Sequence, residues 1–99
     1  LSKWQVGRVV DMSSMFRGAI AFKGEGLDGW NVSNVKNMSK MFADATAFNQ
    51  DLSAWDVKGV KEMKGMFLNA KSFTADLSSW QLHGAEKEDM FLGSSTTTP

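Results

Sequence analysis

The sequence predicts an α/β fold, a right-handed solenoid of about four coils in which each coil is a strand followed by a helix. Two observations support this prediction: a period of about 25 residues, and a change of apolar spacing within each period. Tryptophan marks the period at Trp4, Trp30, Trp55 and Trp80, with spacings of 26, 25 and 25 residues. A unit of this length cannot bury its apolar face alone, so neighbouring units must stack.

The first half of each unit has strand-like spacing. In the third unit it reads Leu52-x-x-Trp55-x-Val57. Tryptophan and valine two residues apart lie on one face of an extended strand, because side chains alternate between the faces. One strand per unit, aligned coil by coil, gives the short parallel sheet.

The second half of each unit has helix-like spacing. From Val60 the apolar positions continue at Met63, Met66, Ala70 and Phe73, three or four residues apart. This rhythm is typical of a short helix with one apolar stripe. A 3₁₀ or irregular segment would show similar spacing.

The units define the domain organisation. Coils are expected to start near Leu1, Leu27, Leu52 and Leu77, and the solenoid covers residues 1–92. The remaining residues 93–99, GSSTTTP, are predicted to form a flexible tail, either a linker or stalk leading elsewhere or simply a loose end. Every Trp, Met and Phe has a place in the period, which leaves none for a separate cofactor site.

Composition excludes several classes of function. The 99 residues carry a net charge of zero, which argues against nucleic-acid binding. The absence of cysteine excludes disulfides, Cys-zinc sites and thiol catalysis. No apolar run is long enough to predict a transmembrane segment. The chain has no initiator methionine and no signal-peptide pattern, so we expect a processed chain or a fragment.

The sequence offers little for catalysis or metal binding. His83 is the single histidine, so a Ser-His-Asp arrangement would have to use it; we predict a solvated side chain instead. Asp51 and Asp76 precede leucine in consecutive units, and stacked carboxylates can hold Ca²⁺. Because no Asp-x-Asp-x-Asp loop is present, we favour turn capping. The prediction is therefore a non-enzyme with no metal and no cofactor.

Polar residues between the buried strand positions form the candidate binding site. They would face the concave side of the predicted solenoid and could bind a protein or a glycan, although a solvated surface would have the same composition. The candidate residues are Gln5, Arg8, Asn31, Ser33, Asp56, Lys58, Gln81 and His83.

These motifs resemble a known family. Leu-x-x-Trp-x-Val is similar to the Leu-x-x-Leu-x-Leu core of leucine-rich repeats. The string WNVSNVKNMSKMFADATAFNQDLSAWDV resembles the 25/26-residue repeat of BspA-type bacterial surface proteins, and the resemblance extends from residue 1 to about residue 92. It implies a leucine-rich-repeat-like solenoid at the cell surface or outside the cell. It further implies adhesion or protein interaction, with a host protein or glycan as possible partner and no catalytic residues.

The two ends of the array differ. The fourth unit has Glu86, Glu88 and Asp89 in part of its apolar stripe, which predicts a polar terminal cap. The first unit keeps its full apolar set from Leu1 to Phe16 with no matching cap. We therefore expect a protein partner or further repeats at the Leu1 end. The alternative function is a small structural subunit that packs into a larger assembly through this uncapped coil.

Overall fold

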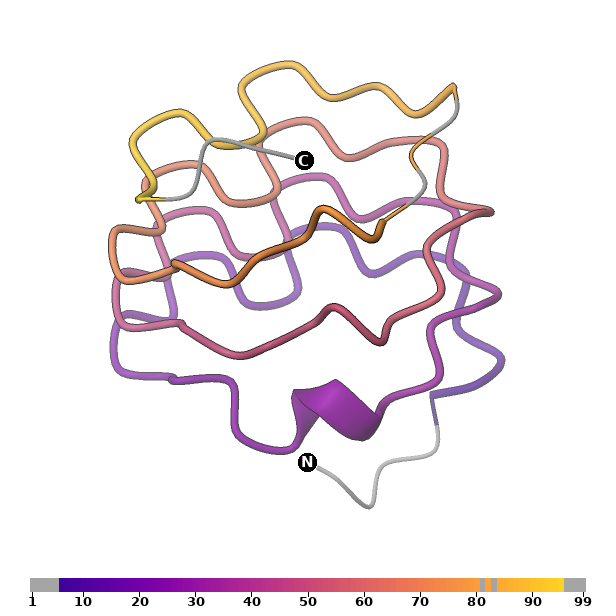
Figure 1. Ribbon diagram of the computed structural model, residues 1–99, viewed down its shortest axis with the longest axis horizontal. Coiled ribbons are helices and arrows are strands. Elements are labelled where there is room, and N and C mark those ends of the chain that lie inside the picture. Colours follow the sequence, from indigo (N-terminus) through magenta and orange to yellow (C-terminus); the bar gives the residue numbers. More distant parts are fainter. Residues whose placement is uncertain (1–5, 81, 83, 96–99) are drawn as a thin grey trace.

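Four coils lie one above another in the computed structural model, which describes residues 6–80, 82 and 84–95 (Figure 1). Coil 1 runs to residue 26, coil 2 spans 27–51, coil 3 spans 52–76, and coil 4 begins at 77. Single parallel bridges pair Asp11 with Asn37, Asn37 with Glu62, and Glu62 with Glu86. The 25-residue period is thus the step from one coil to the next.

The prediction of strand-helix coils is wrong. Within the described residues the helical content is one 3₁₀ turn, η1 (Leu27–Gly29), and the strand content is limited to the isolated bridges. The coils are built from turns. The expected strand fails because Leu52 and Trp55 close a turn, in which the Trp55 amide donates to the Leu52 carbonyl at 3.0 Å. The α/β leucine-rich-repeat-like solenoid with a parallel sheet is therefore replaced by a stack of turns.

The segments predicted as helices are rows of consecutive turns, residues 12–18, 38–44, 63–69 and 87–93, which we call turn rows. In the first row the amide of Met15 donates to Met12 within the row, whereas the amide of Phe16 donates to Met41 of coil 2 at 2.9 Å. Every second amide of the first three rows bonds to the next coil in this way, at 2.7 to 2.9 Å. The row therefore shares its backbone bonds between itself and its neighbour, which an α-helix cannot do.

Positive φ angles make these rows incompatible with a helix. Each row has two such residues, four positions apart, with φ between 56° and 79°. They are Ser14 and Gly18, Lys40 and Asp44, Gly65 and Asn69, and Asp89 and Gly93. A left-handed residue every four positions repeatedly reverses the local chain direction, which gives the wavy trace of the rows in Figure 1.

Tryptophan side chains join the coils on the side of the stack away from the turn rows. The indole Nε1 of Trp55 donates to the carbonyl of Leu27 at 2.8 Å, and that of Trp80 donates to Leu52 at 2.9 Å. Trp30, Trp55 and Trp80 are all buried, with 4 to 6% exposure. The predicted interior column of tryptophans is confirmed for these three; Trp4 lies outside the described residues.

Phenylalanine rings fill the centre of the stack. Phe16, Phe42, Phe67 and Phe91 form one column with centroids 5.6 Å apart at every step and rings within 9° of parallel. A second column of Phe22, Phe48 and Phe73 packs beside it, and Phe42 lies 3.9 Å from Phe48. These columns explain the three-and-four apolar spacing without a helix.

The first residues of the predicted tail contact the stack. The Ser95 hydroxyl donates to the carbonyl of Lys71 at 2.7 Å, and the Ser94 hydroxyl donates to Phe91 at 3.0 Å. Residues 96–99 lie outside the described part of the chain. The chain after Phe91 therefore turns back along coil 3 as far as it is described.

Candidate functional site

The tryptophan side of the stack carries the predicted binding residues in coils 2 and 3. Val32 and Val57 are buried, with 1% and 2% exposure, whereas Asn31, Ser33, Asp56 and Lys58 on either side of them are exposed. We call the surface formed by these four exposed residues the side face. Its inward and outward alternation was predicted correctly, although the backbone consists of turns and irregular segments rather than a strand.

Local hydrogen bonds fix the polar groups of the side face. The Asn31 Oδ1 accepts bonds from the amide and hydroxyl of Ser33, at 3.1 and 2.7 Å. The Asp56 Oδ1 accepts a bond from the Lys58 amide at 3.2 Å. These short side-chain-to-backbone bonds are typical of Asn and Asp in turns. They orient the side chains, and Asp56 stays exposed.

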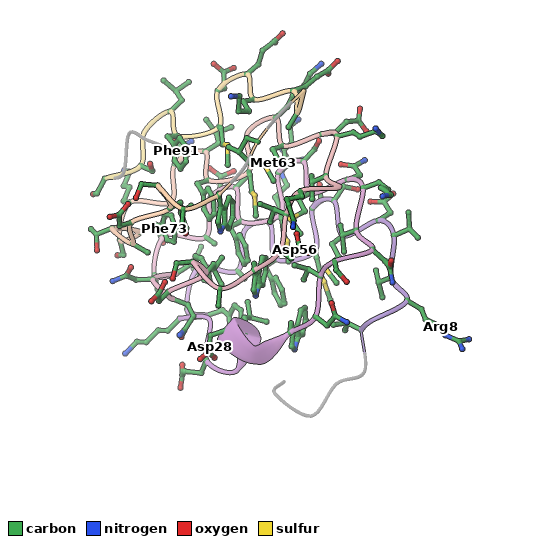
Figure 2. The ribbon with its side chains drawn as sticks, turned by 45° about the vertical axis from the view of Figure 1, so that its right-hand side comes forward. Arg8, Asp28, Asp56, Met63, Phe73 and Phe91 are labelled. Atoms are coloured by element: carbon green, nitrogen blue, oxygen red, sulfur yellow. The ribbon has the colours of Figure 1, made fainter. Side chains whose placement is uncertain are left out.

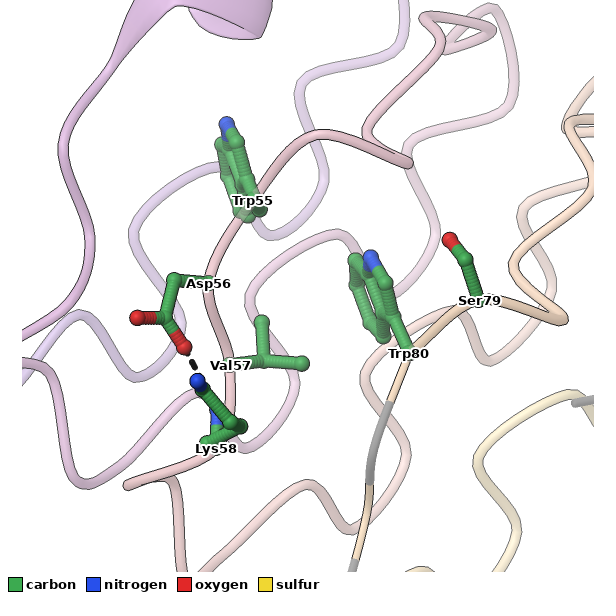
Figure 3. Close-up of a pocket in the computed structure, with 6 residues that line it drawn as sticks. All are labelled: Trp55, Asp56, Val57, Lys58, Ser79 and Trp80. Carbon is green, nitrogen blue, oxygen red and sulfur yellow. Dashed lines mark hydrogen bonds between the residues drawn. The ribbon is translucent and has the colours of Figure 1, made fainter.

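A hollow of about 290 Å³ lies between coils 3 and 4 at the side face. Figure 3 shows the two indole rings, Trp55 and Trp80, with Asp56 and Lys58 on one flank and Ser79 on the other. Val57 completes the lining. Both indole N–H groups are bonded to the preceding coil, so the rings present carbon edges to the hollow and are held in place.

Of the other four predicted site residues, the structure describes Arg8 alone. Arg8 is exposed in coil 1 and projects away from the body of the molecule (Figure 2). Gln5, Gln81 and His83 lie outside the described residues. The sequence placed Trp55 and Trp80 in the interior only, so their contribution to the hollow was missed. Nothing in the spacing of the residues signals it, because the hollow depends on how the two indole rings sit between neighbouring coils.

The recurring aspartates act as turn caps. Asp51 and Asp76 each accept a bond at 2.9 Å from the amide two residues later, that of Ser53 and of Ser78. These amide bonds, and then the serine hydroxyls, lower the pKa of both carboxyl groups. Each carboxylate thus caps its own turn, as the sequence predicted.

Among the described residues no group of three or more His, Cys, Asp or Glu side chains is placed to hold a metal ion. In that same part of the chain, no helix has the length and apolar character needed to cross a bilayer.

A family model described as "Mycoplasma protein of unknown function, DUF285" matches residues 1–98. The chain belongs to this DUF285 family. The match covers all four coils, so the 25-residue stack of turns is this chain's form of the DUF285 repeat. The match shows that the chain is a DUF285 protein, and it gives no support for the narrower prediction of a BspA-type surface protein. No curated protein and no solved structure matches the chain.

Proposed function

We propose that this DUF285 chain is a non-catalytic protein-interaction module that binds a partner protein through the side face and the adjoining hollow. The observation that carries the proposal is the hollow between Trp55 and Trp80, with Asp56 and Lys58 at its edge. Tryptophan is among the residues enriched at binding hot spots. Because both rings are fixed by hydrogen bonds to the preceding coil, little conformational freedom would be lost on binding.

The resemblance of the repeat to BspA-type surface proteins supports adhesion as the role of this binding, at the cell surface or outside the cell. A host protein or a glycan is the corresponding partner class. Exposed amide, hydroxyl and charged groups of Asn31, Ser33 and Lys58 suit either partner, since both offer hydrogen-bonding groups.

The test compares two charge reversals on exposed lysines. Lys58→Glu alters the edge of the hollow, and Lys71→Glu is the matched control away from it. We expect binding to arrays of extracellular proteins and glycans to weaken at least about tenfold, about 1.4 kcal/mol, in the first variant only. A ligand that loses affinity equally with both variants, or no ligand in either array, would contradict the proposal.

A further inference from the structure

The two ends of the stack present complementary backbone groups. In each internal step the amides of one turn row donate to carbonyls of the next coil. Coil 1 has carbonyls in the accepting positions, and coil 4 has amides in the donating positions. Among the described residues these groups have no hydrogen-bond partner. The carbonyls are those of Asp11, Ser13, Met15 and Arg17, and the amides are those of Lys87, Asp89, Phe91 and Gly93.

The positional equivalence of the rows sets the register in which these ends match. Residues with positive φ fall at the same places in all four rows, including Ser14 and Gly18 in the first and Asp89 and Gly93 in the last. If coil 1 of a second copy followed coil 4, the amide of Asp89 would donate a hydrogen bond to the carbonyl of Ser13 in that copy. The same offset brings all four amides to the four carbonyls.

Apolar groups are exposed at both ends in the same register. Met15 is 40% exposed, whereas its equivalents Met41 and Met66 in coils 2 and 3 are fully buried. Phe16 and Phe91, the two ends of the main ring column, are partly buried, and every internal step of that column is 5.6 Å. A further Phe16 could therefore stack on Phe91 at the spacing that the column already uses.

The charges at the two ends have opposite sign. Residues 6–22 of coil 1 contain two arginines and one aspartate, a net charge of +1. Residues 86–93 of coil 4 contain three acids, Glu86, Glu88 and Asp89, and one lysine, a net charge of −2. Opposite potentials favour the encounter of these ends and disfavour contact between two like ends.

We propose that a second copy of this chain stacks head to tail on the first, with coil 1 of one copy covering coil 4 of the other. The contact is heterologous, so it leaves one end of each type open and can continue into longer stacks. It goes beyond the binding proposed for the side face, and the two surfaces are separate. It also gives the assembly alternative a defined partner, and it competes with the prediction of a polar terminal cap at coil 4.

The experiment uses two end-blocking variants. Met15→Glu adds an acid to the coil 1 end, where it would meet the acidic coil 4 of a second copy. Leu92→Arg changes a side chain that is 59% exposed at the coil 4 end, where the register places Arg17 of the second copy next to it. Val10→Lys is the control, because Val10 is exposed in coil 1 and coils 2 and 3 have Lys36 and Lys61 at that position.

Sedimentation velocity between about 10 µM and about 1 mM covers the affinities of weak interfaces. We expect the average mass of the wild type and of Val10→Lys to rise with concentration, and each end-blocked variant to stay monomeric. The two blocked variants mixed together should form a 1:1 pair, because each retains one intact end. Lys58→Glu should associate like the wild type, which separates this proposal from binding at the side face.

Amide exchange in the wild type provides a second measurement that needs no substitution. The amides of Lys87, Asp89, Phe91 and Gly93 should become protected as concentration rises, while exchange at central positions such as Phe42 stays unchanged. A wild type that is monomeric at the highest concentration would overturn the proposal. So would folded blocked variants that fail to pair when mixed, or association without protection of these four amides.

Discussion

At the scale of single residues, Trp55 shows how one side chain joins two coils. Its indole is 4% exposed, donates a hydrogen bond to Leu27 of coil 2, and packs against the ring of Phe42 at a centroid distance of 6.4 Å. Trp80 repeats the arrangement one coil later with Leu52 and Phe67. The side chain thus supplies both packing and a backbone link on the side of the stack away from the turn rows.

Replacing Trp55 with alanine should lower the free energy of unfolding by about 3–5 kcal/mol, because it opens a cavity between coils. Trp55→Phe should cost less, about 1–3 kcal/mol, since it retains a ring but loses part of the indole volume and one of the two hydrogen bonds to the Leu27 carbonyl, which keeps the bond from the Trp30 amide. Lys61→Ala, on an exposed position, should stay within about 0.5 kcal/mol. Chemical denaturation measures all three, and similar midpoints for Trp55→Ala and Lys61→Ala would show that the indole does not join the coils.

The turn-capping aspartates predict a pH dependence. Amide bonds and then hydroxyl bonds from serine lower the folded pKa of Asp51 and Asp76, and the Ser13 hydroxyl and then its amide lower that of Asp11. The aspartates of the unfolded chain have a pKa of about 3.9, so as pH falls they take up protons before those of the folded chain do. Their contribution to stability is complete above about pH 4 and is lost as pH falls through the lower folded values.

Urea denaturation across this range should show a midpoint that falls below about pH 4. A variant with asparagine at all three positions keeps the side-chain acceptor but has no carboxyl group to titrate, so its midpoint should fall less steeply with acid. If the variant and the wild type lose stability in parallel, other groups dominate acid unfolding.

At the scale of the elements, the apolar pattern predicted which side chains are buried but not the backbone that places them there. The three-and-four spacing from Val60 to Phe73 fits both an amphipathic helix and a row of turns, because either brings those residues to one side. The distinguishing signal lies in the polar positions between them. Gly65 and Asn69 are four residues apart, and both are residue types that tolerate positive φ. A residue with positive φ at every fourth position excludes a continuous right-handed helix.

The same reasoning applies to the candidate site. Alternation around Val32 and Val57 was enough to predict that Asn31, Ser33, Asp56 and Lys58 point outward. The hollow was not predictable, because it depends on the placement of two indole rings from different coils. Sequence spacing specifies the side of the chain on which a residue lies, and the packing between coils specifies the shape of the surface.

Gly65→Ala tests the turn row against a helix through the sign of its effect. In a helix interior, alanine in place of glycine would stabilise by about 0.5–1 kcal/mol. At a φ of 61° it should instead destabilise by about 1–2 kcal/mol, because a Cβ atom disfavours the left-handed conformation.

Lys40→Gly is the matched change at the equivalent position of coil 2, where φ is 56°. Relief of the left-handed strain opposes the added freedom of the unfolded chain, so the effect should lie between neutral and about 1 kcal/mol stabilising. Thermal or chemical unfolding measures both variants. Stabilisation by Gly65→Ala together with destabilisation by Lys40→Gly would favour the helix.

At the scale of the whole molecule, the stack is close to one-dimensional, since each coil bonds to its immediate neighbours. The ring columns run through all four coils, yet each ring contacts rings of its own and adjacent coils. Phe67, for example, contacts Phe42 in coil 2 and Phe91 in coil 4. Energetic coupling between substitutions should therefore decline with the number of coils between them.

Two double-mutant cycles with phenylalanine-to-leucine substitutions measure that decline. Phe42 and Phe67 stack at 5.6 Å, so their combined effect on unfolding should differ from the sum of the single effects by about 0.5–3 kcal/mol. Phe22 contacts Phe16 and Phe48, whereas Phe91 contacts Phe67. Because Phe22 and Phe91 share no ring partner, their effects should add within about 0.5 kcal/mol. Coupling of equal size in the two cycles would mean that the coils respond as one rigid core. Binding of a partner at one end would then change the stability of every coil in the stack.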